Sequence, residues 1–220
     1  QKKDVSQSKR FIGNAQVDYK IHGLEDLRLN VNAGIDMSYS GGTVDIPQGA
    51  EQSWHAQLQS GSGAYTIYHQ KKIDKTLEAY ADYSKTINKH SFGVMAGYSW
   101  QHFYVESDSK TTKKSDESVL NEFVDKSEYF LVSFFARANY SYDNRYMATV
   151  TVREDGTSRF QNNKWGLFPS VALGWNIKGE QFLKNEKAVS NLKLRLSWGQ
   201  TGQQDLNAGD YPTLASYQTN

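Results

Sequence analysis

The sequence contains no cysteine, and only three proline and three methionine residues among 220. Without thiols there is no disulfide framework, no thiolate metal site and no cysteine nucleophile. Neither sign of charge dominates, because 25 lysine and arginine residues balance 24 acidic ones, so we expect no nucleic-acid partner. No apolar run approaches the roughly 18 residues that a membrane-spanning helix requires.

Motifs of several enzyme classes are also missing from the sequence. It holds no Walker A, GxGxxG or GxSxG pattern, and its five histidines lack HExxH spacing. Nothing points to the paired carboxylates of a glycoside hydrolase. Asp205, Asn207 and Asp210 are close together, but they lack the spacing of an EF-hand calcium loop. We therefore expect a protein that is not an enzyme and holds no cofactor or metal.

The sequence is rich in aromatic residues, at 13%, and 14 of them are tyrosine. Its mean hydropathy is nevertheless polar, at −0.71. This combination suits strands that are polar on one side and apolar on the other. Both a membrane barrel and a soluble sugar-binding β protein are built from such strands.

Strict alternation of apolar and polar residues is the main pattern in the chain. From residue 27 to 40, the odd positions are apolar or aromatic and the even ones are polar or glycine. Successive side chains of a strand point to opposite faces, so this segment predicts a strand between two different media. It is longer than the roughly 9–11 residues that cross a bilayer at a tilt. Similar segments are 9–21, 64–72, 76–87, 91–106, 127–142, 146–153, 166–177 and 191–199.

The connections between these segments are predicted to alternate between short turns and long polar loops, after a polar lead-in at residues 1–9. This alternation is typical of outer-membrane barrels, where short turns face the periplasm. Residues 180–187 have helical character, and 117–124 are the place for a short helix. The predicted short turns are 22–26, 88–90 and 143–145, and the longer connections are 41–63, 107–126, 154–164 and 178–190.

Aromatic and arginine residues are sorted in a way that favours the membrane. With the short turns in the periplasm, two aromatic girdles form at the two interfaces. An arginine facing lipid would cost roughly 2–4 kcal/mol at mid-depth. The periplasmic girdle is Tyr19, Tyr140, Tyr142, Tyr146 and Trp175, and the outer one is Tyr39, Tyr98, Trp100 and Trp198. The arginines predicted to line the lumen are Arg28, Arg137, Arg153 and Arg195.

Two groups of residues are candidates for more specific roles. Trp54, Tyr65, Tyr68 and Trp165 lie in or beside predicted outer loops, where aromatic rings suit stacking on a sugar or packing between loops. The segment 154–160, EDGTSRF, is interpreted as a turn in which Asp-Gly supplies a positive-φ position. Pairing of Arg153 or Arg159 with the acids of this segment would hold the loop in place.

A longer stretch of sequence resembles a known family. The runs RANYSYDNRYMATVTVREDGTSRF, NNKWGLFPSVALGWNI, EQFL and SNLKLRLSWGQTGQQD look like the barrel of SusC/RagA-type TonB-dependent outer-membrane transporters. The resemblance extends from about residue 129 to 205, and before residue 127 the chain is similar only in pattern. The residues of the shared motif are Arg153, Asp155, Gly156, Ser158, Arg159 and Phe160.

This resemblance implies an all-β fold and a role in import. The eight or so antiparallel strands would be roughly a third of a 22-stranded transmembrane barrel. Such transporters import oligosaccharides or peptides with a SusD-like lipoprotein as a lid and the TonB complex as energy source. Outer-membrane lipids would surround the wall. No plug domain, TonB box or signal peptide is recognised in residues 1–220, so we expect this chain to supply barrel wall and outer loops.

Two other interpretations fit the alternation of the strands. Eight strands suffice for a small closed outer-membrane barrel, which would act as an adhesin or a structural protein. A soluble carbohydrate-binding β-sandwich would instead bury the apolar sides of the strands in a common core. The three interpretations differ in where Leu29, Val31, Ile35, Val150 and Leu194 lie: against lipid, or inside a water-soluble core.

Overall fold

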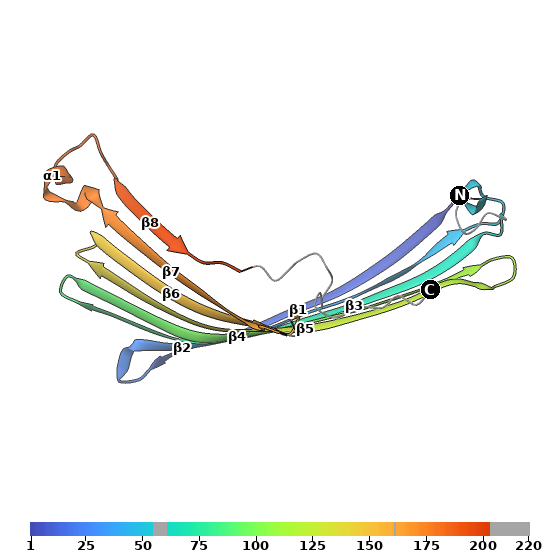
Figure 1. Ribbon diagram of the computed structural model, residues 1–220, viewed down its shortest axis with the longest axis horizontal. Helices are drawn as coiled ribbons and strands as arrows, with labels where there is room; N and C mark the ends of the chain where they lie inside the picture. The colour runs from blue at the N-terminus through green and yellow to red at the C-terminus, as the bar shows by residue number, and fades with distance from the viewer. Residues whose placement is uncertain (55–60, 161, 203–220) are drawn as a thin grey trace. The chain divides into compact units, whose positions relative to one another are not determined.

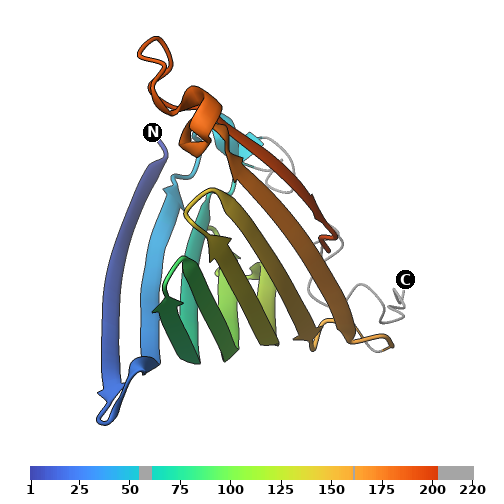
Figure 2. The ribbon, with the colours of Figure 1, turned by 90° about the vertical axis from the view of Figure 1, so that its left-hand side faces the viewer.

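The computed structural model describes residues 1–54, 61–160 and 162–202. Its eight strands form one sheet in which each strand pairs with the next along the chain (Figure 1). The strands lie side by side in chain order, as Figure 2 also shows. The predicted all-β fold of about eight long antiparallel strands is therefore confirmed.

The strands are long, and the helices are few and short. The strands are β1 (Lys3–Ile21), β2 (Leu24–Ile46), β3 (Ala64–Ile87), β4 (His90–Lys113), β5 (Val119–Tyr142), β6 (Tyr146–Thr157), β7 (Trp165–Asn176) and β8 (Lys193–Gly199). The helical pieces in the described part of the chain are η1 (Glu51–Trp54), η3 (Ile177–Gly179) and α1 (Gln181–Lys184). Of these, α1 lies within the segment that the sequence predicts to be helical.

The chain divides into two compact units, and strands β1 to β5 contribute residues to both. Unit 1 consists of Gln1–Asn14, Gly34–Lys75 and His102–Tyr129. Unit 2 consists of Ala15–Ala33, Thr76–Gln101 and Phe130–Asn220. The three predicted short turns all belong to unit 2, together with β6, β7 and β8.

The short turns have the backbone conformations that their residues favour. Gly23 has a φ of +82° between β1 and β2, and Asn88 has a φ of 54° between β3 and β4. Asp143 and Asn144 both have positive φ, and the Arg145 amide donates to the Tyr142 carbonyl at 2.9 Å. Two consecutive positive-φ residues match the right-handed twist of a hairpin, and Asp and Asn tolerate them.

The predicted loop over residues 107–126 is wrong. Most of it is strand, because β4 continues to Lys113 and β5 begins at Val119. No helix forms over 117–124. The few apolar residues of this hairpin, Val119, Leu120, Phe123 and Val124, do not recur with a period of two, so alternation does not reveal the strands. Ladder hydrogen bonds hold the strands together. Its tip is stabilised by Asp116, whose carboxylate accepts from the Ser118 amide at 3.1 Å and from its hydroxyl.

Other strands are also longer than predicted, so the alternation of short and long connections is weaker than expected. β1 already begins at Lys3 in the predicted lead-in, and β2 continues to Ile46. The segments 64–72 and 76–87 form one continuous strand, β3. β6 continues to Thr157, inside the predicted loop 154–164. A β4 of 24 residues is about twice what crosses a bilayer.

The apolar sides of the strands are exposed rather than packed in a core. Leu29, Val31, Val150 and Leu194 are 40%, 44%, 46% and 48% exposed, and Ile35 is half-buried. Among the described residues, Ala64 is the one buried hydrophobic residue. A soluble sandwich would bury these side chains between two sheets, so the single sheet excludes that interpretation.

The ends of the strand order bear on the closed-barrel interpretation. β1 and β8 stand at opposite ends of the order, and each pairs with one neighbour within the described residues. A closed barrel of eight strands would pair them with each other. The sheet is therefore open in this chain, as expected of a segment of a larger barrel.

Candidate functional site: the two faces and the turn end of the sheet

The register of β5 to β8 assigns the side chains of this part of unit 2 to two faces. Thr151 lies opposite Arg137 on β5 and opposite Ser170 on β7. Gly174, on the same face as Ser170, lies opposite Arg195 on β8. Directly opposed residues of a sheet share a face. Three of the predicted lumen-lining residues are thus on one polar face: Arg137, Arg153 and Arg195.

The other face of these strands is apolar. Val150 lies opposite Ala138 and Val171, and Leu173 lies opposite Ala148 and Leu196. On this face of β6 the residues from Tyr146 to Val152 are aliphatic or aromatic, and Glu154 follows them near the far end of the strand. Sorting of this kind needs two media, and from Tyr146 to Arg153 the side chains that are costly in hydrocarbon lie on the other face.

The arginines of the polar face differ in their partners. Arg153 donates to Asp155 at 2.6 Å and to the Ser133 hydroxyl at 3.0 Å, and so links β6 to β5. Arg137 donates to the Thr151 hydroxyl at 3.4 Å. Within the described part of the chain, the guanidinium groups of Arg28 and Arg195 make no hydrogen bond or ion pair. These two exposed groups remain available to something outside the chain.

The predicted family motif, within residues 153–160, lies at the end of β6 that is distant from the short turns. The Ser158 hydroxyl accepts from the Phe130 amide at 2.9 Å, and the Thr157 amide donates to the Lys164 carbonyl at 3.0 Å. Gly156 lies in the strand and does not have the predicted positive φ. The Trp165 ring lies directly over Gly156, where a Cβ would be 2.8 Å from it. The glycine is therefore required by the close approach of an aromatic ring and not by a turn.

The rest of the motif surrounds this contact. Asp155 and Phe160 help to line a small cavity of about 120 Å³ beside Trp165. The Arg159 amide donates to the Thr157 hydroxyl at 3.3 Å. The motif thus joins β5, β6 and β7 where the polar connection begins.

The four aromatic candidates for ligand contact do not form one cluster. Trp165 stacks on Phe134 with ring centroids 6.1 Å apart, and its ring packs on the apolar face of unit 2. Trp54 ends η1 and lies against Gly61. Tyr65 and Tyr68 are three residues apart on β3, so they point to opposite faces of the sheet. Ligand contact by these residues stays a prediction, and Tyr65 and Tyr68 cannot share one side of the wall.

Unit 1 has polar side chains on both faces of β3 and β4. On one side of β3 and β4, Gln70 donates to the Ser107 hydroxyl at 3.2 Å. On the other side, His69 lies 3.0 Å from Asp108. Lys71 lies on the same side as His69, with its ammonium 5.9 Å from the Tyr39 ring and 5.7 Å from the Tyr104 ring. Polar side chains therefore lie on both sides of β3 and β4 in unit 1, without the sorting seen in β5 to β8.

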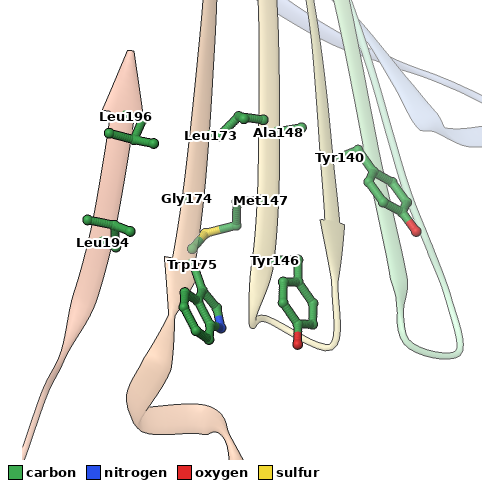
Figure 3. A pocket seen from close by; sticks show the side chains of 9 residues that line it. All are labelled: Tyr140, Tyr146, Met147, Ala148, Leu173, Gly174, Trp175, Leu194 and Leu196. Atoms are coloured by element: carbon green, nitrogen blue, oxygen red, sulfur yellow. The ribbon is translucent and has the colours of Figure 1, made fainter.

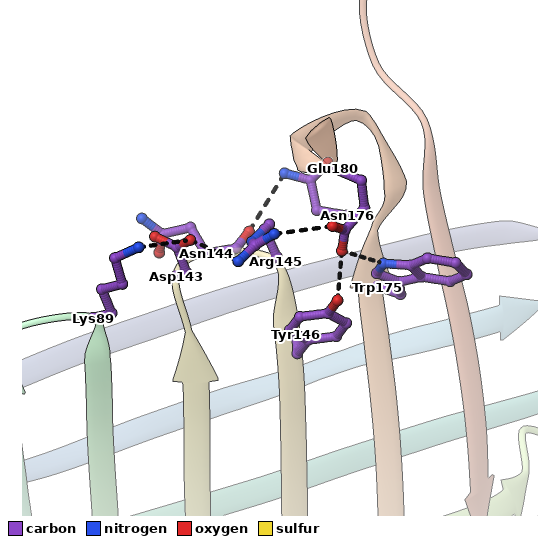
Figure 4. Close-up of polar contacts among 8 residues, drawn as sticks. All are labelled: Lys89, Asp143, Asn144, Arg145, Tyr146, Trp175, Asn176 and Glu180. Carbon is purple, nitrogen blue, oxygen red and sulfur yellow. Dashed lines mark hydrogen bonds and ion pairs between the residues drawn. The ribbon is translucent and has the colours of Figure 1, made fainter. Parts of the chain in front are cut away.

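The carboxylate of Glu180 lies at the turn end of unit 2, where it binds side chains from two neighbouring connections (Figure 4). Glu180, between η3 and α1, accepts from the Tyr146 hydroxyl at 2.6 Å and from the Trp175 indole at 3.1 Å. Arg145 donates to it at 2.9 Å and also pairs with Asp143. These bonds tie the β5–β6 turn to the β7–β8 connection. The hydrogen bonds from Tyr146 and Trp175 hold the pKa of Glu180 below its usual range.

No metal-binding cluster of His, Asp and Glu occurs among the described residues. Asp205, Asn207 and Asp210 lie outside that part of the chain. In the part that the structure describes, no helix is long and apolar enough to cross a membrane.

Comparison with known proteins identifies the class of this sheet. The profile of the family described as "TonB dependent receptor-like, beta-barrel" matches residues 3–220. The chain is 38% identical over 227 residues to the TonB-dependent receptor SusC of Bacteroides thetaiotaomicron, covering 100% of this chain and 22% of SusC. It is 34% identical over 154 residues to the TonB-dependent receptor P39 of Formosa agariphila, covering 64% of this chain and 15% of that protein.

Solved structures agree on the fold. In its closed-closed state, the RagAB peptide importer matches 96% of this chain with a TM-score of 0.83 and 23% identity, and the match covers 24% of that chain. The ferric citrate transporter FecA matches 78% of this chain with a TM-score of 0.53 and 9% identity, over 26% of its own length.

The fold and the two faces define a wall segment of a transmembrane β-barrel. The chain belongs to the TonB dependent receptor-like β-barrel family, as a member of the SusC/RagA type, and its place is the bacterial outer membrane. It spans less than a quarter of the length of SusC.

Proposed function

We propose that this chain forms part of the wall and the outer connections of an outer-membrane importer that takes up large nutrients, either oligosaccharides or peptides. The apolar face of unit 2 meets lipid and the polar face lines the lumen. The observation that carries the proposal is the sorting of side chains in β5 to β8, with Arg137, Arg153 and Arg195 on one face and exposed aliphatic residues on the other.

The wall has no catalytic role in this proposal. The capture of cargo outside and its passage inward depend on a SusD-like lipoprotein and on the TonB complex, which act on regions beyond this chain. RagAB, whose fold is similar, is described as a peptide importer, and this makes peptides one of the two cargo classes to test.

Free guanidinium groups on the polar face are the part of the wall most suited to contact cargo or a plug. Arg195 has no partner within the described residues, whereas Asp155 and Ser133 already engage Arg153. We expect Arg195→Ala to lower uptake without loss of folded barrel. Leu196→Ala, on the neighbouring apolar-face position, is the matched control and should leave uptake unchanged.

The test uses a host strain that lacks its own copy and expresses the full-length transporter. Uptake of fluorescent oligosaccharide and peptide pools is measured with and without a functional TonB. The proposal expects one pool to enter, only when both the transporter and TonB are present. Equal uptake in the strain without the transporter, or without TonB, would overturn it.

A further inference from the structure

The apolar face of unit 2 is hollowed near the short turns (Figure 3). A groove of about 520 Å³ runs across β5 to β8 at this end. Its walls are almost entirely carbon. They include Tyr140, Tyr146, Ala148, Leu173, Trp175 and Leu194.

The register explains why the surface is hollow here. Ala148 lies between Tyr140 on β5 and Leu173 on β7, so a methyl group sits between two large side chains. Leu173 is opposite Leu196, and both project strongly from the sheet, at 53% and 63% exposed. Ala148 therefore forms a floor that larger neighbours surround.

One end of the groove is polar and the other is not. Tyr146 and Trp175 line the groove with their rings, while the Tyr146 hydroxyl and the Trp175 indole N–H both donate to Glu180. The polar tips of the rings thus mark the level of the membrane interface. From there the groove leads towards Leu173 and Leu196, deeper in the apolar face. Its shape suits an amphiphile with its head at the turns and its chain in the groove.

The charges at the turns indicate the type of head group. Lys89 and Arg145 are balanced by Asp143 and Glu180, and all four lie together at this end (Figure 4). A balanced set of charges favours a zwitterionic head group over an anionic one.

We propose that this groove is a binding site for one acyl chain of a zwitterionic glycerophospholipid of the periplasmic leaflet. The proposal depends on the location in the outer membrane, with the short turns on the periplasmic side, and not on the cargo or on import. The acyl chain is already in hydrocarbon, so no transfer from water favours the groove, and occupancy depends on van der Waals packing against its walls. Each lost carbon–carbon contact costs about 0.1–0.2 kcal/mol, so partial filling of the groove has a measurable effect.

The experiment uses the full-length transporter in lipid nanodiscs that contain a phosphatidylethanolamine with a photoreactive group in the middle of one acyl chain. After irradiation, labelled peptides are identified by mass spectrometry. We expect labelling to concentrate at residues 146–148, 173–175 and 194–196. Uniform labelling over the whole exposed apolar face would overturn the proposal, because it would mean bulk lipid only.

Variants that fill the groove provide the specific test. Ala148→Trp, and the smaller Ala148→Leu, displace several packing contacts of about 0.1–0.2 kcal/mol each and should lower labelling of these segments by about twofold or more. Ala138→Trp is the control, since Ala138 lies on the same face, opposite Val150, outside the groove. Heat-modifiable migration on gels shows that each variant is folded. Unchanged labelling in a folded Ala148→Leu variant would overturn the proposal.

Two further outcomes would assign the groove to a different occupant. Equal labelling by a phosphatidylglycerol probe would overturn the zwitterionic assignment. Cross-links between two transporter copies in place of lipid labelling would assign the groove to a protein contact instead, and would also overturn the proposal. None of these results depends on whether the transporter carries oligosaccharides or peptides.

Discussion

Strands β1 to β5 contribute residues to both unit 1 and unit 2, but the two units differ in how polar side chains are distributed over the faces of the sheet. In β5 to β8 of unit 2, one face is apolar and exposed while the other holds arginine, threonine and serine. In unit 1, His69 and Asp108 pair on one side of the sheet and Gln70 and Ser107 on the other. The first arrangement suits hydrocarbon on one side, and the second suits water on both.

This difference teaches that strand length and membrane crossing are separate properties here. A strand of 24 residues is far longer than the bilayer needs, and only its part in unit 2 has the hydrophobic period of a membrane strand. The remaining part is held by its ladder and by cross-strand pairs such as Thr66 with Thr111, whose hydroxyls are 2.9 Å apart.

The strongest test of the difference between the two units introduces one arginine into each of them. Val150→Arg, on the apolar face of unit 2, should destabilise the folded barrel by about 2–4 kcal/mol, because the guanidinium must enter hydrocarbon. Ile67→Arg, on the His69 side of unit 1, should have little effect. Folding of the full-length protein into lipid vesicles at increasing urea measures both. Equal losses of stability in the two variants would show that Val150 and Ile67 do not face different media.

A second test concerns the ring over Gly156. Gly156→Val should destabilise the barrel by about 1–3 kcal/mol, since its Cβ would meet the Trp165 ring at 2.8 Å. The same substitution combined with Trp165→Ala should cost less, because the ring is gone. A double-mutant cycle of urea unfolding gives the coupling. Additive effects would mean that the ring is not what selects glycine.

A third test uses pH at the turn end of unit 2. The pKa of Glu180 is lowered in the folded state, so its carboxylate stabilises the β7–β8 connection above the usual glutamate pKa of about 4.3. That contribution is lost as the pH falls through the lowered folded pKa. Hydrogen exchange of residues 177–192 should therefore increase in acid. Glu180→Gln should exchange faster at neutral pH and respond less to acid, and an unchanged acid response would exclude Glu180 as the cause.

The smallest effect is expected from the exposed pair in unit 1. Asp108→Asn removes the carboxylate that lies 3.0 Å from the His69 ring, and the His69 side chain is largely in water. Such pairs contribute roughly 0–1 kcal/mol, so the urea midpoint should barely move. A loss comparable to that of Val150→Arg would mean that unit 1 is not solvated on this side.

The sequence predicted unit 2 better than unit 1. The alternation in 146–153 and the Asp143–Asn144 turn are found where expected, because one medium on each side imposes a period of two. The hairpin at 107–126 is not predicted, because its few apolar residues do not alternate with the polar ones. Gly156 is interpreted from the sequence as a turn residue, because no local signal shows that Trp165 lies across from it.

Alternation in the sequence alone determined that this chain consists of long antiparallel strands with two different faces, and the family resemblance favoured a membrane barrel wall over a closed barrel or a soluble sandwich. Those features are local, because the polarity of each side chain matches the medium on its own side of the sheet. Only the tertiary structure decided which residues meet across strands: the carboxylate of Glu180 with Tyr146 and Trp175, the ring of Trp165 with Gly156, and the hollow over Ala148. These depend on register, and register is fixed by pairing between segments that are distant in the sequence.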